Sequence, residues 1–139
     1  MRRLQSQGVH HITLTGADRQ TSIDFWEGVL GMPFVFEQPN LDNESESHLY
    51  FDPGDGRLIT IFTNEEREGG PERTPTDPGC VHHIAFAVSQ SSFNQAVERL
   101  DRVGEVDLVD VVVAALDPQP VRLEQDVGLR VAMRRHEAI

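Results

Sequence analysis

The sequence contains no lysine, and its 12 basic residues, all arginine, face 23 acidic residues. A net charge of −11 argues against a protein that binds nucleic acid through clustered positive charge. The single cysteine, Cys80, excludes an internal disulfide and makes no zinc knuckle. No apolar run approaches the roughly 20 residues that span a bilayer, and the first residues are too short and polar for a secretion signal. We therefore expect a cytoplasmic protein with no membrane or nucleic-acid partner.

The length of 139 residues fits one domain or two small modules that share a core. The first half predicts a strand over residues 8–15 and a helix over residues 23–30, capped by Thr21 or Ser22. The buried stripe of that helix is expected at Ile23, Trp26 and Leu30. Three further strands are predicted at residues 34–36, 48–51 and 58–62.

The strand–helix pattern begins again after residues 64–79, which read as a linker rich in glycine, proline and acidic residues. A strand over residues 81–88 and a helix over residues 90–100, capped by Ser91 or Ser92, are followed by β-branched segments. Further strands are predicted at residues 106–116, 121–124 and 129–133.

The repeat of this pattern at an offset of 72 residues indicates an internal duplication. We expect an α+β fold of two βαβββ-type modules, with curved mixed sheets around a shared cavity and helices outside. The first module covers residues 8–63, and the second covers residues 80–139 with an atypical C-terminal part. Duplicated modules of this kind commonly pair within a chain or between chains, so a homodimer is expected.

Both modules begin with His-His-Ile, at residues 10–12 and 82–84. Alternate strand residues face opposite ways, so Ile12 packs toward the helix while His11 points to the other face, and the same holds for His83. Neutral imidazole is the commonest side-chain metal ligand, which makes His11 and His83 candidate metal ligands. The alternative is that they are ordinary strand residues held by hydrogen bonds. Their equivalent positions in the repeat favour the metal.

His48 and Tyr50 share one face of their predicted strand, as Thr60 and Phe62 do in the next. A histidine and a tyrosine beside a metal act as proton donor, proton acceptor or substrate anchor. We therefore interpret His48 and Tyr50 as candidate catalytic residues. The alternative, that they are half-exposed strand residues, is weaker for His48 because it can face the same cavity as His11.

These segments resemble the vicinal oxygen chelate superfamily, which includes glyoxalase I, fosfomycin and bleomycin resistance proteins, and extradiol dioxygenases. The likeness covers about residues 8 to 100 and lies in both His-His-Ile strands, the helix segment Asp24 to Met32 and the His-Leu-Tyr-Phe strand. It is strongest toward the ring-cleaving dioxygenase branch. The resemblance implies a divalent metal ion, commonly Fe(II), with Mn(II), Zn(II) or Ni(II) as alternatives, bound by His11 and His83. Where the family has its third ligand, a glutamate, this sequence has Ala132, so Glu124 or a partner chain would have to supply the carboxylate.

The function that this resemblance implies is a metal-dependent, ring-cleaving (extradiol-type) dioxygenase acting on a small oxygenated aromatic molecule. One alternative is a glyoxalase-like lyase or isomerase, although Thr60 stands where that chemistry wants a glutamate base. Another is a protein of the bleomycin-resistance kind that binds a small molecule or drug without turnover, for which no metal is needed.

Overall fold

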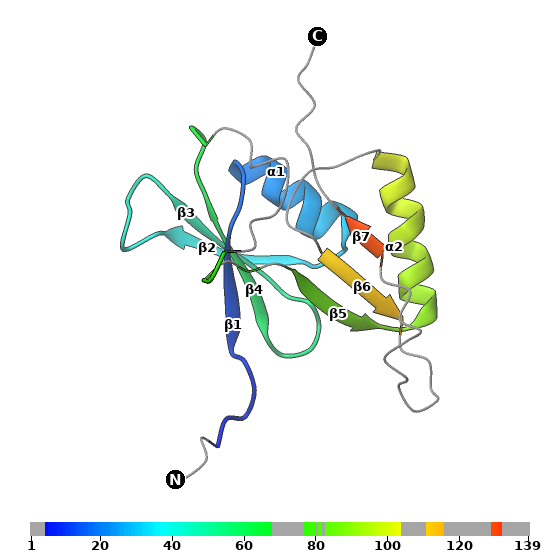
Figure 1. Ribbon diagram of the computed structural model, residues 1–139. Helices are drawn as coiled ribbons and strands as arrows, with labels where there is room; N and C mark the ends of the chain where they lie inside the picture. The colour runs from blue at the N-terminus through cyan, green and yellow to red at the C-terminus, as the bar shows by residue number, and fades with distance from the viewer. Residues whose placement is uncertain are drawn as a thin grey trace. The chain divides into compact units, whose positions relative to one another are not determined.

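The computed structural model describes residues 5–67, 77–79, 81, 83–103, 111–115 and 129–131. The chain divides into two compact units, Met1–Glu68 and Gly69–Ile139, and each is described by itself. The fold is α+β, with a mixed sheet and helical segments in each unit (Figure 1). No helix among these residues is long and apolar enough to cross a membrane.

The first unit has the expected order of one strand, one helical segment and three strands. Its elements are β1 (His11–Thr15), α1 (Arg19–Ile23), η1 (Asp24–Val29), β2 (Phe34–Pro39), β3 (Ser47–Phe51) and β4 (Leu58–Thr63). The strands form one sheet in the order β1-β4-β3-β2, in which β1 runs parallel to β4 and the other pairs are antiparallel. A parallel pair requires a long crossover, and the helical segment lies within it.

The helical segment begins earlier than the sequence pattern predicts. Asp18 is the cap, and its carboxylate accepts from the backbone N–H of Thr21 and from the Thr21 hydroxyl, each at 2.8 Å. The prediction of Thr21 or Ser22 as the cap was therefore wrong. Five polar residues in a row, Asp18 to Ser22, offered several possible caps, and the carboxylate of Asp18 satisfies one of the free N–H groups of the first turn. The segment then widens into the π-helical η1 and ends at Gly31, whose φ of 73° suits glycine.

The buried stripe of this segment differs from the predicted one in all but Trp26. The buried residues are Ser22, Phe25, Trp26 and Val29, while Ile23 and Leu30 are only half-buried. Both sets have helical spacing, so apolar periodicity alone could not choose between them. Burial of Ser22 is possible because its hydroxyl donates to the backbone oxygen of Asp18 at 2.8 Å. The rest of the core comes from the sheet: Leu14, Leu49, Phe51, Ile59 and Ile61.

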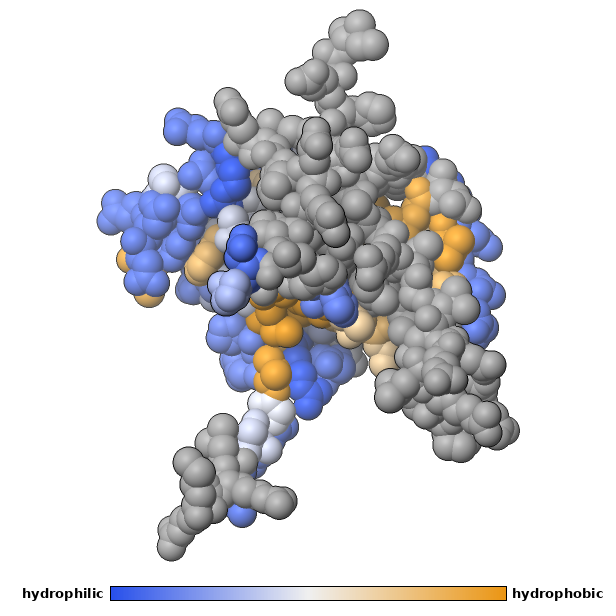
Figure 2. All heavy atoms as spheres, in the orientation of Figure 1, coloured by the Kyte–Doolittle hydropathy of each residue, from blue (hydrophilic) through white to orange (hydrophobic). Residues whose placement is uncertain are grey.

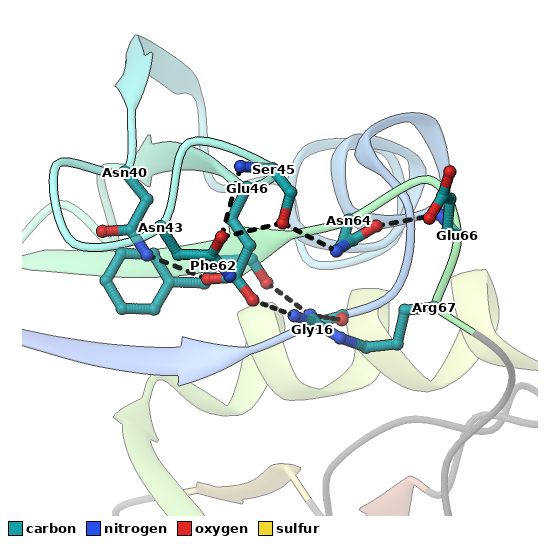
Figure 3. Close-up of polar contacts among 9 residues, drawn as sticks. All are labelled: Gly16, Asn40, Asn43, Ser45, Glu46, Phe62, Asn64, Glu66 and Arg67. Atoms are coloured by element: carbon teal, nitrogen blue, oxygen red, sulfur yellow. Dashed lines mark hydrogen bonds and ion pairs between the residues drawn. The ribbon is translucent and has the colours of Figure 1, made fainter.

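Two ion pairs fix the ends of the first sheet. Arg19 of α1 makes a forked pair with Glu37 of β2, with Nη2 to Oε2 at 2.9 Å, and this hydrogen bonding holds the pKa of Glu37 below its ordinary value. Arg67 pairs with Glu46 and also donates to the backbone oxygens of Phe62 and Gly16 (Figure 3). Arg67 thereby binds the β2–β3 loop to the C-terminal ends of β1 and β4.

Hydrophilic side chains dominate the β2–β3 loop, at the left of Figures 1 and 2. The loop is held from within as well as by Arg67. Glu46 accepts from the side-chain amide of Asn40 at 2.8 Å, and Asn43 accepts from the hydroxyl of Ser45 at 2.8 Å. The acidic loop is therefore an ordered element, although its composition is that of a solvated turn.

The described part of the second unit begins like the first, with a strand and a helix. It contains β5 (Ile84–Val88), α2 (Gln90–Val103), β6 (Val111–Ala115) and β7 (Leu129–Val131), with the strand order β5-β6-β7. β6 lies beside β5 and parallel to it, in the place that β4 takes beside β1. Ser89 caps α2 by accepting from the backbone N–H of Ser92 at 3.1 Å, so the prediction of Ser91 or Ser92 was wrong. The predicted strand over residues 121–124 lies outside the described residues.

Gly16 provides a test of how tightly the first unit is packed. A methyl group added there would lie 2.3 Å from Cγ2 of the buried Ile61, so Gly16→Ala should lower the free energy of unfolding by about 1–3 kcal/mol. Gly28→Ala is the matched control, because nothing lies within 4 Å of the added methyl group. That variant should be neutral or more stable by up to about 1 kcal/mol. Urea denaturation measures both, and equal stabilities for the two variants would contradict the packing.

Candidate functional site

The two faces of the first sheet have different chemistry. Leu49 and Phe51 of β3 are fully buried in the core, and His48 and Tyr50, which alternate with them, lie on the opposite face. The strand register places neighbours beside them on both sides. His48 lies opposite Phe62 of β4 and Gln38 of β2, while Tyr50 lies opposite Thr60 and Phe36. The structure thus brings both predicted catalytic residues together on one polar and aromatic surface.

A chain of hydrogen bonds runs across this surface. The side-chain amide of Gln38 donates to the phenol oxygen of Tyr50 at 2.7 Å, and that oxygen lies 3.0 Å from Nδ1 of His48. The ring of His48 also packs against neighbouring rings, with its centroid 4.4 Å from that of Tyr50 and 4.5 Å from that of Phe62. These contacts hold the imidazole on both sides and leave its other nitrogen, Nε2, to be accounted for.

Nε2 of His48 is buried and has no hydrogen-bond partner among the residues that the structure describes. Such a group is costly to bury unless a ligand or water satisfies it, so its presence is a reason to look for function. Burial lowers the pKa of His48 below its ordinary value of 6.5, and the positive charge of a protonated His11 lowers it further. His48 therefore stays neutral at neutral pH and within electrostatic reach of His11.

His11 is the first residue of β1, and its side chain is exposed. Its Nδ1 lies 2.9 Å from Nδ1 of His10, and the two rings meet edge to face. One of these nitrogens must carry the proton that the other accepts. With His10 as the partner of Nδ1, the ring of His11 has Nε2 as its remaining donor atom.

This arrangement fits His11 as a metal ligand. A histidine that binds a metal through one nitrogen commonly uses the other in a hydrogen bond that orients the ring, and His10 provides that contact. In the described part of the chain, no group of three or more His, Cys, Asp and Glu side chains is placed to hold a metal ion. Among the described residues, His11 is thus a single candidate ligand without a complete ligand set around it.

The remaining predicted ligands belong to the second unit. His83 is exposed and lies immediately before β5. It precedes Ile84 as His11 precedes Ile12. Glu124 and Ala132 lie outside the described residues. The convergence of His11 and His83 on one ion, and the role of Glu124, therefore stay predictions.

Sequence reasoning missed Gln38. The predicted strand ended at Phe36, whereas β2 extends to Pro39 and places Gln38 directly opposite His48. Alternation from Phe36 across two more residues is the signal that would have found it. A second polar contact was also missed. The hydroxyl of the buried Thr60 donates to the hydroxyl oxygen of Thr13 at 2.7 Å.

Comparison with known proteins identifies the family of this chain. Residues 8–113 match the model of the Glyoxalase/Bleomycin resistance protein/Dioxygenase superfamily. Two relatives from Bacillus subtilis (strain 168) carry the name "Putative ring-cleaving dioxygenase": MhqE, 30% identical, and MhqO, 39% identical. Each alignment covers 73% of this chain but only 33% of MhqE and 35% of MhqO. The chain thus spans about a third of the length of these curated relatives.

A solved structure shows the same fold. It is a variant of the genomically encoded fosfomycin resistance protein FosX from Listeria monocytogenes, complexed with Mn(II) and 1S,2S-dihydroxypropylphosphonic acid. The TM-score is 0.52 at 20% identity, over 72% of this chain and 74% of that chain. At this level of identity the likeness concerns the fold alone.

The lowered pKa of His48 makes stability depend on pH. The unfolded chain takes up a proton at His48 near pH 6.5, while the folded chain resists it until lower pH. Because the unfolded state then binds more protons, the free energy of unfolding should fall as the pH drops from about 7 to 5. His48→Gln should lose less stability over this range, as measured by urea denaturation at each pH. Equal pH slopes for the two proteins would contradict the burial of this imidazole.

Proposed function

Because the chain belongs to the Glyoxalase/Bleomycin resistance protein/Dioxygenase superfamily, we propose that it is a metal-dependent, ring-cleaving dioxygenase for a small oxygenated aromatic molecule. The observation that carries this proposal is His48, a neutral imidazole whose buried Nε2 has no partner among the described residues. The relatives MhqE and MhqO, named for ring cleavage, support the choice of reaction.

The metal ion would be held by His11 and His83, with a carboxylate from Glu124 or from a partner chain as the third ligand. A divalent ion is supported by FosX, which shares the fold and is complexed with Mn(II). We prefer Fe(II), because two histidines and one carboxylate are the ligands of many non-haem iron oxygenases. Such an ion supplies Lewis acidity and, as Fe(II), the electrons that O₂ chemistry requires.

The chain's own residues would orient the substrate and manage its proton. His48 would act at Nε2 as acid, base or hydrogen-bond donor toward a ring oxygen, and the ring contacts with Phe62 and Tyr50 hold it in place. The phenol of Tyr50 would orient the substrate. Phe36, with its ring centroid 5.3 Å from that of Tyr50, adds an exposed apolar surface on which an aromatic substrate could pack.

The glyoxalase-like alternative wants a glutamate base in the first unit, at the position of Thr60. Thr60 occupies the position in question, fully buried, with its hydroxyl bound to that of Thr13. A threonine hydroxyl does not serve as the carboxylate base that this isomerisation needs. A protein that binds a small molecule without turnover remains the competing outcome, and metal content distinguishes it.

A second copy of the chain would add modules to one that spans only about a third of the length of MhqE and MhqO. We propose that two copies assemble, because duplicated modules of this kind commonly pair between chains as well as within them. Light scattering of the purified protein should give twice the mass of one chain. A monomer at micromolar concentration would contradict this.

Metal content tests the proposed function directly. Protein purified without a chelator or a histidine tag and supplied with Fe(II) should contain near-stoichiometric iron, measured by atomic emission. His11→Ala and His83→Ala should each lose the iron, because each variant removes one of the three proposed ligands. His10→Ala should only weaken binding, by about 10–100-fold, because His10 orients His11 without being a ligand.

Dioxygenase activity is measured with the same proteins. Oxygen uptake with substituted hydroquinones and catechols should appear in the iron-loaded protein and disappear with the iron. A protein that takes up no metal after iron supplementation would rule out the enzyme. If that protein still bound an aromatic ligand, the binding function would take its place.

A further inference from the structure

Gln38 has no role in the function proposed so far, yet it begins the hydrogen-bond chain that ends on His48. Its side-chain amide nitrogen lies 2.7 Å from the phenol oxygen of Tyr50, which lies 3.0 Å from Nδ1 of His48. Register explains the contact, because Gln38 of β2 lies opposite His48 of β3. Gln38, at the far end of these hydrogen bonds, can therefore influence the imidazole of His48.

The direction of the chain decides which nitrogen of His48 carries the proton. The phenol of Tyr50 has one proton to give. If the phenol, which accepts from Gln38, gives its own proton to Nδ1, a neutral His48 carries its proton on Nε2. In the opposite direction, His48 would donate from Nδ1 and leave Nε2 as a bare acceptor.

We propose that Gln38 is a positioning residue that, through Tyr50, holds His48 in the tautomer with its N–H at Nε2, where it donates a hydrogen bond to a substrate oxygen. This inference rests on the proposed function for the identity of that oxygen. It replaces the open choice among acid, base and donor with one role. Nε2 has no acceptor among the described residues, as a donor awaiting a ligand requires.

Neighbouring contacts hold both ends of this hydrogen-bond chain in place. The preceding residue, Glu37, is bound by a forked ion pair to Arg19 of α1, which fixes the backbone of β2 at this point. On the other side, the rings of Tyr50 and Phe62 lie 4.4 Å and 4.5 Å from that of His48. Rotation of the imidazole would break these contacts. Because burial also keeps the ring neutral near pH 7, the tautomer is well defined there.

Nitrogen-15 NMR of the histidine rings tests this in the full chain. Two-bond correlations between ring protons and ring nitrogens distinguish the two neutral tautomers, and the spectrum of His48→Gln assigns the signals. In the metal-free wild type at pH 7.5, His48 should carry its proton on Nε2. Gln38→Glu can only accept from Tyr50 and should move the proton to Nδ1. Gln38→Leu should give a mixture of both forms.

The control is Gln90→Glu, which makes the same charge change at an exposed position in the second unit and should leave the His48 signals unchanged. Backbone amide spectra establish that each variant is folded. If Gln38→Glu does not fold, Tyr50→Phe replaces it, because loss of the hydroxyl should release the tautomer as Gln38→Leu does. A wild-type proton on Nδ1, or a tautomer unmoved in every folded variant of Gln38 and Tyr50, would overturn the proposal.

The outcome is separable from that of the proposed function, because the spectra need neither metal nor turnover. A tautomer that follows Gln38 in a protein without dioxygenase activity would reject the proposed function alone. An active dioxygenase whose His48 tautomer ignores Gln38 would reject the positioning role alone. In the active enzyme, Gln38→Leu should lower kcat by roughly 10- to 100-fold, since proton placement of this kind contributes about 10²–10⁴-fold to catalysis.

Discussion

The alternation of side chains in β3 is the constraint on which the site depends. Leu49 and Phe51 fill the core with no measurable exposure, and they lie opposite Ile61 and Ile59 of β4. Their burial sends the two intervening residues, His48 and Tyr50, to the other face. A slip of one residue in this register would place the imidazole in the core and two large apolar side chains outside it. The energy of packing thus selects the chemistry of the opposite face.

The same alternation explains how much could be predicted from the sequence. It was enough to place His48 and Tyr50 on one face and His11 opposite Ile12, because period two leaves a strand only two choices. Periodicity did not suffice to predict the buried face of the helix, because Ile23 and Phe25 both belong to sets of residues with helical spacing. Gln38 was missed for another reason: the predicted strand ended at Phe36, although the alternation continues for two more residues.

The chemistry proposed here divides between the two units of the chain. The hydrogen-bond chain from Gln38 to His48 lies wholly in the first unit, and so does His11. His83 belongs to the second, whose described strands have the order β5-β6-β7. The proposed proton-handling group is therefore built without residues of the second unit.

Arg67 stands one residue before the end of the first unit, and its contacts have a mechanical meaning. Tension applied to the chain beyond the first unit would load this guanidinium as well as the backbone that leads to β4. Its bonds to Gly16, Phe62 and Glu46 divide that load between two parallel strands and a loop. Pulling then shears several contacts at once, where a free end would let β4 peel away from its neighbours one hydrogen bond at a time.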